Sequence, residues 1–221
     1  MTWSNLYIMR HEILLTLLIL LQLVADLSAS EQRGKLVHTT IVLFVCLMIA
    51  GFLPAENANL FGNMYVSDSL RLLLKTILTI STLIVLLQSS TWLLKPQHQH
   101  KARTFYLSIF GTLMGMFFML SAGDFLMLYL GLELATLPLT LLAAADRELR
   151  RSAEAGLKLL MSSAVSTSIL LFGLSLMYGI YGTFHFREIA PSTGESYLSV
   201  MALIFFLCGL GFKLSLVPFH F

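Results

Sequence analysis

The chain has 221 residues, of which 57% are hydrophobic and 12% are charged, and its formal net charge is +2. Soluble domains carry about 25% charged residues, so this composition, with a mean hydropathy of +0.83, excludes an ordinary soluble protein. Several apolar runs reach the roughly 20 residues needed to cross a hydrocarbon core of about 30 Å. The sequence therefore predicts an all-α polytopic membrane protein.

Apolar runs that alternate with polar breaks predict about seven transmembrane helices. Their expected ranges are 6–27, 36–54, 70–94, 104–122, 124–145, 154–179 and 197–221. The breaks carry charged and turn-forming residues. None of them is long enough to hold a soluble domain, so the function must reside in the helical bundle.

The distribution of basic residues predicts the orientation of the chain. Loops on one side of the predicted bundle hold Arg33, Lys35, Lys95, Lys101, Arg103, Arg147, Arg150 and Arg151. The opposite side holds Arg10 and Arg187. By the positive-inside rule, the amino terminus is expected outside the cytoplasm.

The first half of the chain offers few candidates for chemistry. Lys75 is deeper in helix 70–94 than a flanking residue should be, but the sequence indicates no clear partner. His98 and His100 form an H-x-H pattern in a basic loop, which is more typical of a solvated loop than of a metal site. Gly111 and Gly115 form a G-x-x-x-G pattern on helix 104–122, which indicates close packing against a neighbouring helix.

An acid lies near the centre of helix 124–145. Glu133 is about nine residues, or about 14 Å, from the start of this helix, and apolar residues flank it on both sides. Tyr129, Glu133, Thr136 and Thr140 are spaced so that they share one face of the helix. A charge at this depth requires a partner, a hydrated cavity or a proton. The alternative is a neutral acid that only bonds to a neighbouring helix.

A second polar stripe enters helix 154–179. Glu154, Lys158, Ser162 and Ser166 are spaced by four residues, which is typical of one helix face. They are consistent with a hydrated path from the cytoplasmic side. Two alternatives remain open: Lys158 is close enough to the helix end to extend to the membrane surface, and serines are common at close helix contacts.

Helix 197–221 carries the third deep charge. Lys213 has no acid on its own helix, so Glu133, the deep acid in helix 124–145, is its expected partner. His220 follows seven residues later on the same helix face. Gly209, Gly211 and Pro218 predict an interrupted helix, a feature that recurs at ion sites of transporters.

The carboxyl end has no polar flank after Phe221, which indicates a truncated product or a fragment of a longer protein.

Together these residues predict a proton relay rather than a metal or nucleotide site. Burial favours the neutral forms of Lys and Glu, whereas a nearby opposite charge favours the charged forms. A carboxylate that moves between two lysines would therefore load one and unload the other. The chain shows no metal-ligand spacing, dinucleotide fingerprint or cysteine cluster, so no metal, nucleotide, flavin or iron–sulfur centre is expected in it.

Three segments resemble the antiporter-like membrane subunits of respiratory complex I, and most closely subunit N of NADH:quinone oxidoreductases. They read FLMLYLGLELATLPLTLLAA, RRSAEAGLKLLMSSAVSTSILLFGLSLMYGIYGTF and LCGLGFKLSLVPFHF. The resemblance extends from about residue 105 to residue 221. It implies two parts: three amino-terminal transmembrane helices (1–103) and the first, truncated part of an antiporter-like proton-translocation repeat (104–221).

The resemblance also implies roles for individual residues. Glu133, Lys158, Lys213 and His220 match proton-translocating positions of the family. The residues expected to support the polar path are Tyr129, Thr136, Ser162 and Ser166, with Pro218 at the helix break. The family has fourteen helices in subunit N, so a complete proton path is not expected in this chain alone.

The leading functional interpretation is a proton-translocating membrane subunit of a NADH:quinone oxidoreductase in the bacterial inner membrane. NADH, FMN, iron–sulfur clusters and quinone are expected in partner subunits, with no cofactor and no redox catalysis in this chain. Its expected partners are other membrane subunits, including paralogous antiporter-like ones, and the lipid bilayer, but not nucleic acid. The alternatives are a subunit of a multisubunit cation/proton antiporter or membrane hydrogenase, and a truncated structural remnant without transport.

Overall fold

The computed structural model describes residues 7–28, 33–51, 58–95, 97–98, 101–146, 149–189 and 197–216. Within them the chain is helical apart from one short hairpin. The helices are α2 (Arg10–Ser28), α3 (Arg33–Gly51), α4 (Ser69–Leu93), α5 (Ala102–Ser121), α6 (Phe125–Ala143), α7 (Arg150–Tyr181), α8 (Phe186–Ile189) and α9 (Tyr197–Lys213). The prediction of a helical bundle is confirmed, and the long helices lie within a few residues of the expected ranges except at the two ends of the chain.

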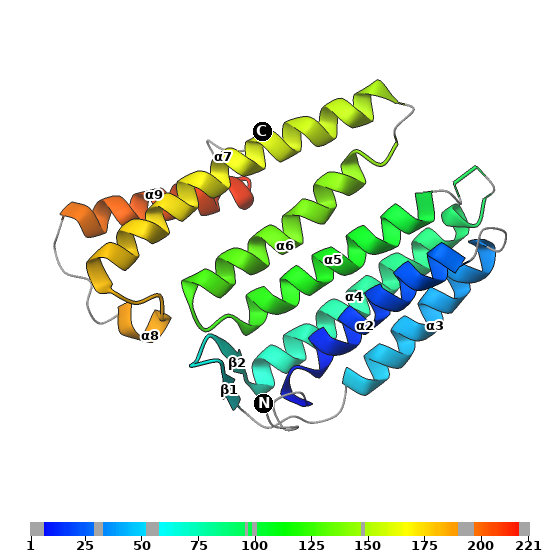
Figure 1. Ribbon diagram of the computed structural model, residues 1–221, viewed down its shortest axis with the longest axis horizontal. Helices are drawn as coiled ribbons and strands as arrows, with labels where there is room; N and C mark the ends of the chain where they lie inside the picture. Colours follow the sequence, from blue (N-terminus) through cyan, green and yellow to red (C-terminus); the bar gives the residue numbers. More distant parts are fainter. Residues whose placement is uncertain are drawn as a thin grey trace.

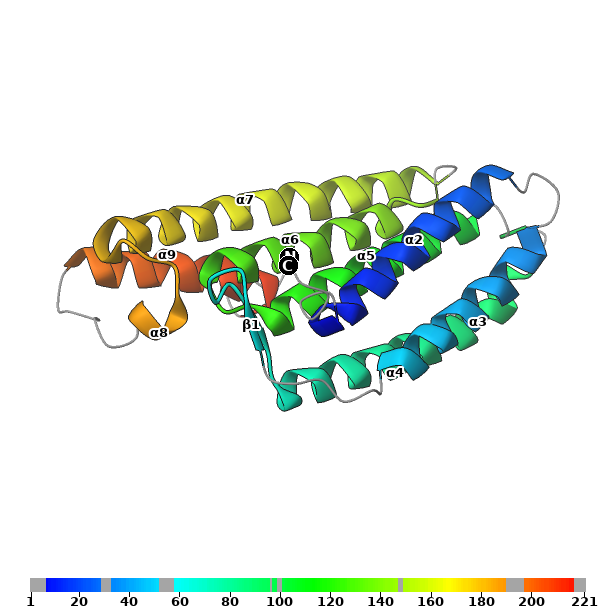
Figure 2. The same ribbon diagram turned by 60° about the horizontal axis from the view of Figure 1, so that its bottom comes forward.

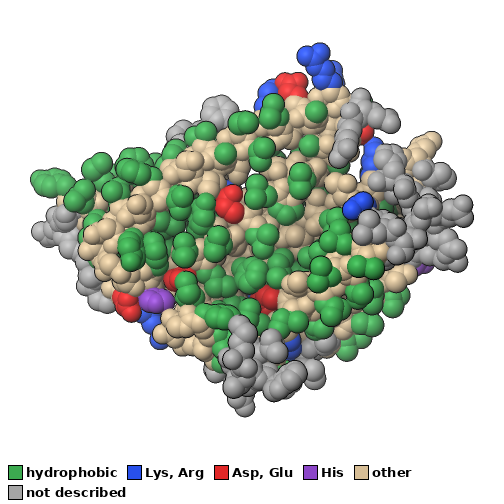
Figure 3. All heavy atoms as spheres, in the orientation of Figure 1, with side chains coloured by type: hydrophobic (Ala, Val, Ile, Leu, Met, Phe, Trp, Pro, Cys, Tyr) green, Lys and Arg blue, Asp and Glu red, His purple; other side chains and the backbone are tan. Residues whose placement is uncertain are grey.

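The helices have the length and surface of membrane-spanning elements. Among the described residues, α4, α5, α6 and α7 are long and apolar enough to cross a membrane, and α9 is a shorter apolar helix. Hydrophobic side chains cover much of the outer face, whereas Lys and Arg gather near the ends of helices (Figure 3). Such a surface is suited to lipid on its flanks and to water at its ends.

The helices pack into two groups that meet at α5 and α6 (Figures 1 and 2). One core lies between α2, α3, α4 and α5 and contains Phe44, Leu86, Tyr106 and Phe110. A smaller core lies where α7 packs against α9, around Leu170 and Leu174. Helix α6 lies between α5 and α7 and therefore faces both groups.

Close contact between α5 and α6 depends on small residues. A methyl group added to Gly115 would lie 2.2 Å from the backbone nitrogen of Ala135, which is much closer than two such atoms can approach. Pro138 of α6 lies against Gly111 in the same interface. The packing role predicted for the G-x-x-x-G pattern is confirmed.

A short hairpin lies between α3 and α4, where the sequence predicts only a loop between helices 36–54 and 70–94. Strands β1 (Ala58–Leu60) and β2 (Tyr65–Ser67) pair antiparallel around a turn in which Phe61, Gly62 and Asn63 have positive φ. Asparagine and glycine tolerate this conformation, which suits tight hairpins. The hairpin is joined to the turn between α5 and α6, because the Gly123 amide donates to the Met64 carbonyl at 2.8 Å.

The two glycines of α9 act differently from the prediction. Gly209 and Gly211 were expected to help interrupt this helix, but both are buried within its continuous part. A methyl group on Gly209 would lie 2.5 Å from Cβ of Leu170, so this glycine allows α9 to approach α7. The helix ends at Lys213, and Ser215 then adopts a positive φ of 53°. Pro218, the predicted break, lies outside the described residues.

Candidate proton site

A partly buried ion pair joins α6 to α9. The Lys213 ammonium donates to Glu133 Oε1 at 2.8 Å, and the two side chains are 6% and 20% exposed, respectively. The partnership predicted from the sequence is therefore present. Each charge offsets the cost of burying the other in an apolar surrounding.

Hydroxyl groups complete the surroundings of the ammonium. Lys213 Nζ also donates to Thr136 Oγ1 at 3.0 Å and to Ser163 Oγ at 2.8 Å. An ammonium has three donor protons, and here each of them has an acceptor. Thr136 in turn donates to the Leu132 carbonyl. Among the described residues, the acceptors of Lys213 are thus one acid and two hydroxyl groups.

Thr167 connects the carboxylate to α7. Its hydroxyl lies 2.6 Å from Glu133 Oε1 and 2.8 Å from the Ser163 carbonyl. A hydroxyl carries a single proton, so Thr167 can donate to only one of these acceptors at a time. A small rotation of this side chain therefore adds a hydrogen bond to Glu133 or removes it.

The contact between α7 and α9 positions Lys213. Ser166 is buried and donates to the Gly209 carbonyl at 2.8 Å, one turn before Lys213. This bond and the close approach at Gly209 fix the end of α9 against α7. Asp124 caps the amino terminus of α6. Its side chain accepts a hydrogen bond from the Met127 amide at 2.7 Å and so satisfies one of the free amides of the first turn.

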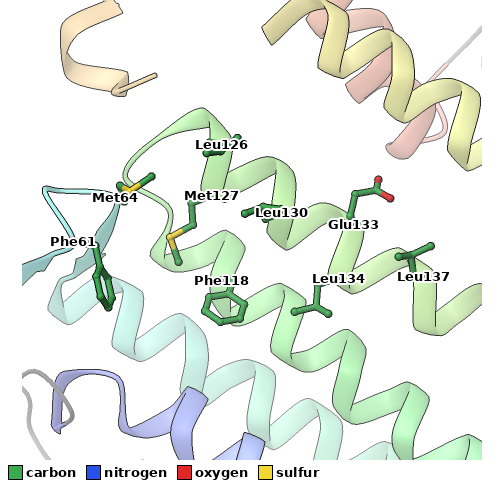
Figure 4. Close-up of a pocket in the computed structure, with 9 residues that line it drawn as sticks. All are labelled: Phe61, Met64, Phe118, Leu126, Met127, Leu130, Glu133, Leu134 and Leu137. Atoms are coloured by element: carbon green, nitrogen blue, oxygen red, sulfur yellow. The ribbon is translucent and has the colours of Figure 1, made fainter. Parts of the chain in front are cut away.

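The Glu133 side chain also borders an apolar groove of about 500 Å³ on the surface of α5 and α6. The groove is lined by Phe61, Met64, Phe118, Leu126, Met127, Leu130, Glu133, Leu134 and Leu137. In Figure 4 the carboxylate points away from Phe118 and Met127, toward α7 and α9. The carboxylate of Glu133 therefore contacts Lys213, whereas the aliphatic part of its side chain borders the apolar groove.

Lys158 and Ser162 do not join this site. Lys158 forms an ion pair with Glu154 at 2.6 Å on the outer face of α7, where 76% of its side chain is exposed. The exposed Ser162 donates to the Lys158 carbonyl. A spacing of four residues advances about 40° beyond a full helical turn, so the stripe winds around α7 and only Ser166 reaches the α9 contact. A proton-transfer role for Lys158 and Ser162 stays a prediction.

The remaining predicted residues are only partly placed. Tyr129 is partly buried one turn before Glu133 and packs with the α7–α9 core. Thr140 is buried and donates to the Leu137 carbonyl rather than to Lys213. His220, like Pro218, lies outside the described residues, so its predicted role stays a prediction.

Sequence reasoning missed Ser163 and Thr167, which do contact the ion pair. Each directly follows a residue of the predicted stripe, Ser162 or Ser166. The signal that could have found them is the serine- and threonine-rich run of α7 itself, in which small hydroxyl residues occur on more than one face.

Sequence reasoning also missed the partner of Lys75. Lys75 forms a buried ion pair with Glu12 of α2, and Tyr65 of the hairpin donates to the same carboxylate oxygen at 3.0 Å. Burial and the nearby Glu12 carboxylate raise the pKa of Tyr65 above its ordinary value. Glu12 escaped notice because it stands next to Arg10 and His11 near the start of the chain, where charges are typical of the membrane surface.

Known proteins are similar to this chain over the helices that carry the ion pair. A family model described as "NADH:quinone oxidoreductase/Mrp antiporter, TM" matches residues 122–221, which include α6, α7 and α9. NADH-quinone oxidoreductase subunit N of Phocaeicola vulgatus is 44% identical over 96% of this chain and 45% of its own length. The same subunit of Azobacteroides pseudotrichonymphae is 39% identical over 100% of this chain and 46% of its own length.

Solved structures show the same fold. A chain of respiratory complex I from Thermus thermophilus superimposes with a TM-score of 0.73 at 21% identity, over 95% of this chain and 45% of that one. A chain of a membrane-bound sulfane sulfur reductase, an archaeal respiratory membrane complex, superimposes with a TM-score of 0.68 at 16% identity.

The chain belongs to the NADH:quinone oxidoreductase/Mrp antiporter family, and the matched region contains both residues of the Glu133–Lys213 pair. Within this family it is a homologue of NADH-quinone oxidoreductase subunit N. It spans about half the length of the curated relatives that it matches.

Proposed function

We propose that this chain is part of a proton-translocating membrane subunit of an NADH:quinone oxidoreductase. The observation that carries the proposal is the Glu133–Lys213 ion pair, which is partly buried between α6 and α9 and bonded to hydroxyl groups. Ionisable side chains inside membrane helices are energetically costly, and they mark ion and proton pathways. The names of the curated relatives support the NADH-linked function over a stand-alone antiporter.

We infer the proton step from the geometry of the pair. While the pair is closed, Lys213 keeps its proton because Glu133, Thr136 and Ser163 accept its three hydrogen bonds. When Glu133 moves away, the ammonium loses its counter-ion inside an apolar bundle, and release of the proton becomes favourable. When Glu133 returns, Lys213 takes up a new proton.

The hydroxyl groups provide the first step of a path. Thr167 can switch its single proton between Glu133 and the Ser163 carbonyl, so its rotation changes how strongly Glu133 is held. Ser163 both contacts Lys213 and lies on α7, the helix that carries Lys158. We infer that further transfer toward Lys158 uses water along α7, and we retain His220 as a further proton site of the proposal.

The rest of the proposal concerns the setting of the chain. Seven membrane crossings, an amino terminus outside the cytoplasm and a location in the bacterial inner membrane fit the basic residues of the loops. Paralogous antiporter-like subunits are its proposed neighbours. NADH, FMN, iron–sulfur clusters and quinone would be bound by partner subunits, whose redox steps would open and close the Glu133–Lys213 pair electrostatically.

The test is proton pumping by the complete complex in membrane vesicles. We expect Glu133→Gln to abolish most of the proton uptake per NADH oxidised while the amount of assembled complex stays the same, because Gln fills the same space without a charge. Lys101→Gln serves as the control, since Lys101 pairs at 2.7 Å with Asp146 near a helix end, away from the proposed path. Unimpaired pumping in the Glu133→Gln variant would sink the proposal.

A further inference from the structure

A second buried ion pair lies outside the proposed path, where the starts of α2 and α4 meet the hairpin (Figure 1). Lys75 Nζ donates to Glu12 Oε1 and, at 3.0 Å, to the Tyr65 hydroxyl. Tyr65 in turn donates to the same Oε1 at 3.0 Å. The Glu12 and Lys75 side chains are only 2% and 3% exposed, respectively. We call Glu12, Lys75 and Tyr65 the Glu12 cluster.

The second oxygen of the same carboxylate is different. Glu12 Oε2 is buried, and no side chain or backbone group of the described residues donates a hydrogen bond to it. A buried acceptor without a donor is costly, and the cost is larger for a charged group. Oε2 is therefore the atom of this carboxylate that can take a proton without breaking the bonds that Lys75 and Tyr65 make to Oε1.

The charged groups around the Glu12 cluster do not supply the missing donor. Arg10 donates to the Gly51 carbonyl at 3.2 Å. Arg71 donates to the Val66 carbonyl at 2.9 Å and lies 3.8 Å from Asp68. His11 packs edge-on against Phe117, at 5.9 Å between ring centres, and its Nε2 is itself buried without a partner among the described residues.

We propose that Glu12 is a proton-accepting carboxyl group of this chain, with Oε2 as the atom that takes and returns the proton. In the ion-paired state, the ammonium of Lys75 and the carboxylate of Glu12 cancel each other's charge. One proton taken from water converts the carboxylate into a carboxylic acid. Because the Lys75 ammonium then lacks its counter-ion, return of the proton to water is favourable and restores the pair. Oε1 keeps its bonds to Lys75 and Tyr65 in both states.

The position of the Glu12 cluster links it to α6. Tyr65 forms an isolated β-bridge with Ala122, between α5 and α6, and the Gly123 amide holds the Met64 carbonyl at 2.8 Å. The hairpin therefore joins Glu12 to the start of the helix that carries Glu133. The use of this link in pumping rests on the proposed function, whereas protonation of Glu12 does not.

Infrared difference spectra between alkaline and acidic pH test the protonation in the complete membrane complex. We expect acidification to produce a carboxylic-acid C=O band that is lost in Glu12→Gln and displaced in Glu12→Asp. Asp68→Asn is the control for sensitivity to a single carboxyl group, since Asp68 directly precedes α4, the helix of Lys75, and 52% of its side chain is exposed. Identical spectra for the unmodified and Glu12→Gln complexes would overturn the proposal.

A pumping measurement separates a proton site from a structural contact. The double variant Glu12→Gln with Lys75→Met leaves no unpaired buried charge, so the complex is expected to assemble. We expect it to pump fewer protons per NADH; unchanged pumping with normal assembly would overturn a role for Glu12 in pumping. If the double variant fails to assemble, the infrared spectrum of the Glu12→Asp complex tests whether Glu12 takes up the proton. Glu133→Gln measured in parallel distinguishes this proposal from the proposed function, because it tests only the latter.

Discussion

At the scale of single residues, the two partners of the Glu133–Lys213 pair differ in how firmly hydrogen bonds fix them. The ammonium is bonded to a carboxylate and two hydroxyls, so its hydrogen-bonding capacity is filled. The carboxylate depends on Lys213 and on Thr167, and Thr167 can also bond to the Ser163 carbonyl. The carboxylate is therefore the more weakly fixed partner, and motion of the pair is expected to begin at Glu133.

Replacement of Thr167 by valine tests this inequality. Valine keeps the shape of threonine but removes the hydroxyl, and a hydrogen bond to a charged group contributes about 1.5–3 kcal/mol. We expect Thr167→Val to lower proton pumping per NADH severalfold without loss of assembled complex, whereas Thr167→Ser keeps the hydroxyl and most of the pumping. Equal pumping by the Val and Ser variants would show that the hydroxyl has no part in the step.

At the scale of helices, the geometry of the site depends on how closely α9 approaches α7. The Ser166 hydroxyl bonds to the Gly209 carbonyl across this contact, and Gly209 leaves no space for a side chain. Small residues that bring helices together are a common basis of membrane packing. Because Lys213 is one turn beyond Gly209, a displacement at this contact is carried directly to the ion pair.

A pair of glycine substitutions tests this contact. Gly209→Ala would place a methyl group 2.5 Å from Cβ of Leu170, whereas Gly179→Ala on α7 would meet no atom within 4 Å. Overpacking costs about 1–3 kcal/mol, and alanine in an open helical position gains up to about 1 kcal/mol. Thermal unfolding in detergent should therefore occur at a lower temperature for Gly209→Ala and not for Gly179→Ala. Equal stability of the two variants would contradict the packing role of Gly209.

At the scale of the whole molecule, the described helices form two packed groups joined through α5 and α6, with charged residues near their ends (Figures 1 and 3). The two ends of α7 differ most clearly. Arg150 and Arg151 begin the helix, and Arg187 follows its other end in α8. By the positive-inside rule, this difference supports the proposed topology, with the Arg150 end in the cytoplasm and the Arg187 end outside.

Cysteine labelling in intact cells tests this orientation. After the native Cys46 and Cys208 are replaced by alanine, we expect an impermeant thiol reagent to label Arg187→Cys in intact cells and Arg150→Cys only after the membrane is opened. Both positions are exposed, so access to the membrane side decides the result. The reverse labelling pattern would invert the proposed topology.

Much of this architecture could be predicted from the sequence because the membrane restricts the chain to long apolar helices. The same restriction makes an isolated deep charge visible, which is why Glu133 and Lys213 were recognised as partners. Glu12 and Lys75 are 63 positions apart in the sequence, so the spacing of residues along one helix could not predict their contact. The choice of Ser163 and Thr167 over Ser162 depends on the rotation of α7 against α9, which a periodic pattern does not determine.

The central claim is that Glu133 and Lys213 act as one unit in moving protons. A double-mutant cycle on proton pumping per NADH tests it most directly, with Glu133→Gln, Lys213→Met and the combined variant compared in the assembled complex. For residues that act as a unit, the effects are not additive. We predict that the combined variant pumps at least as many protons per NADH as the single variant that pumps less. Losses that add independently, or single variants that pump normally, would contradict the account.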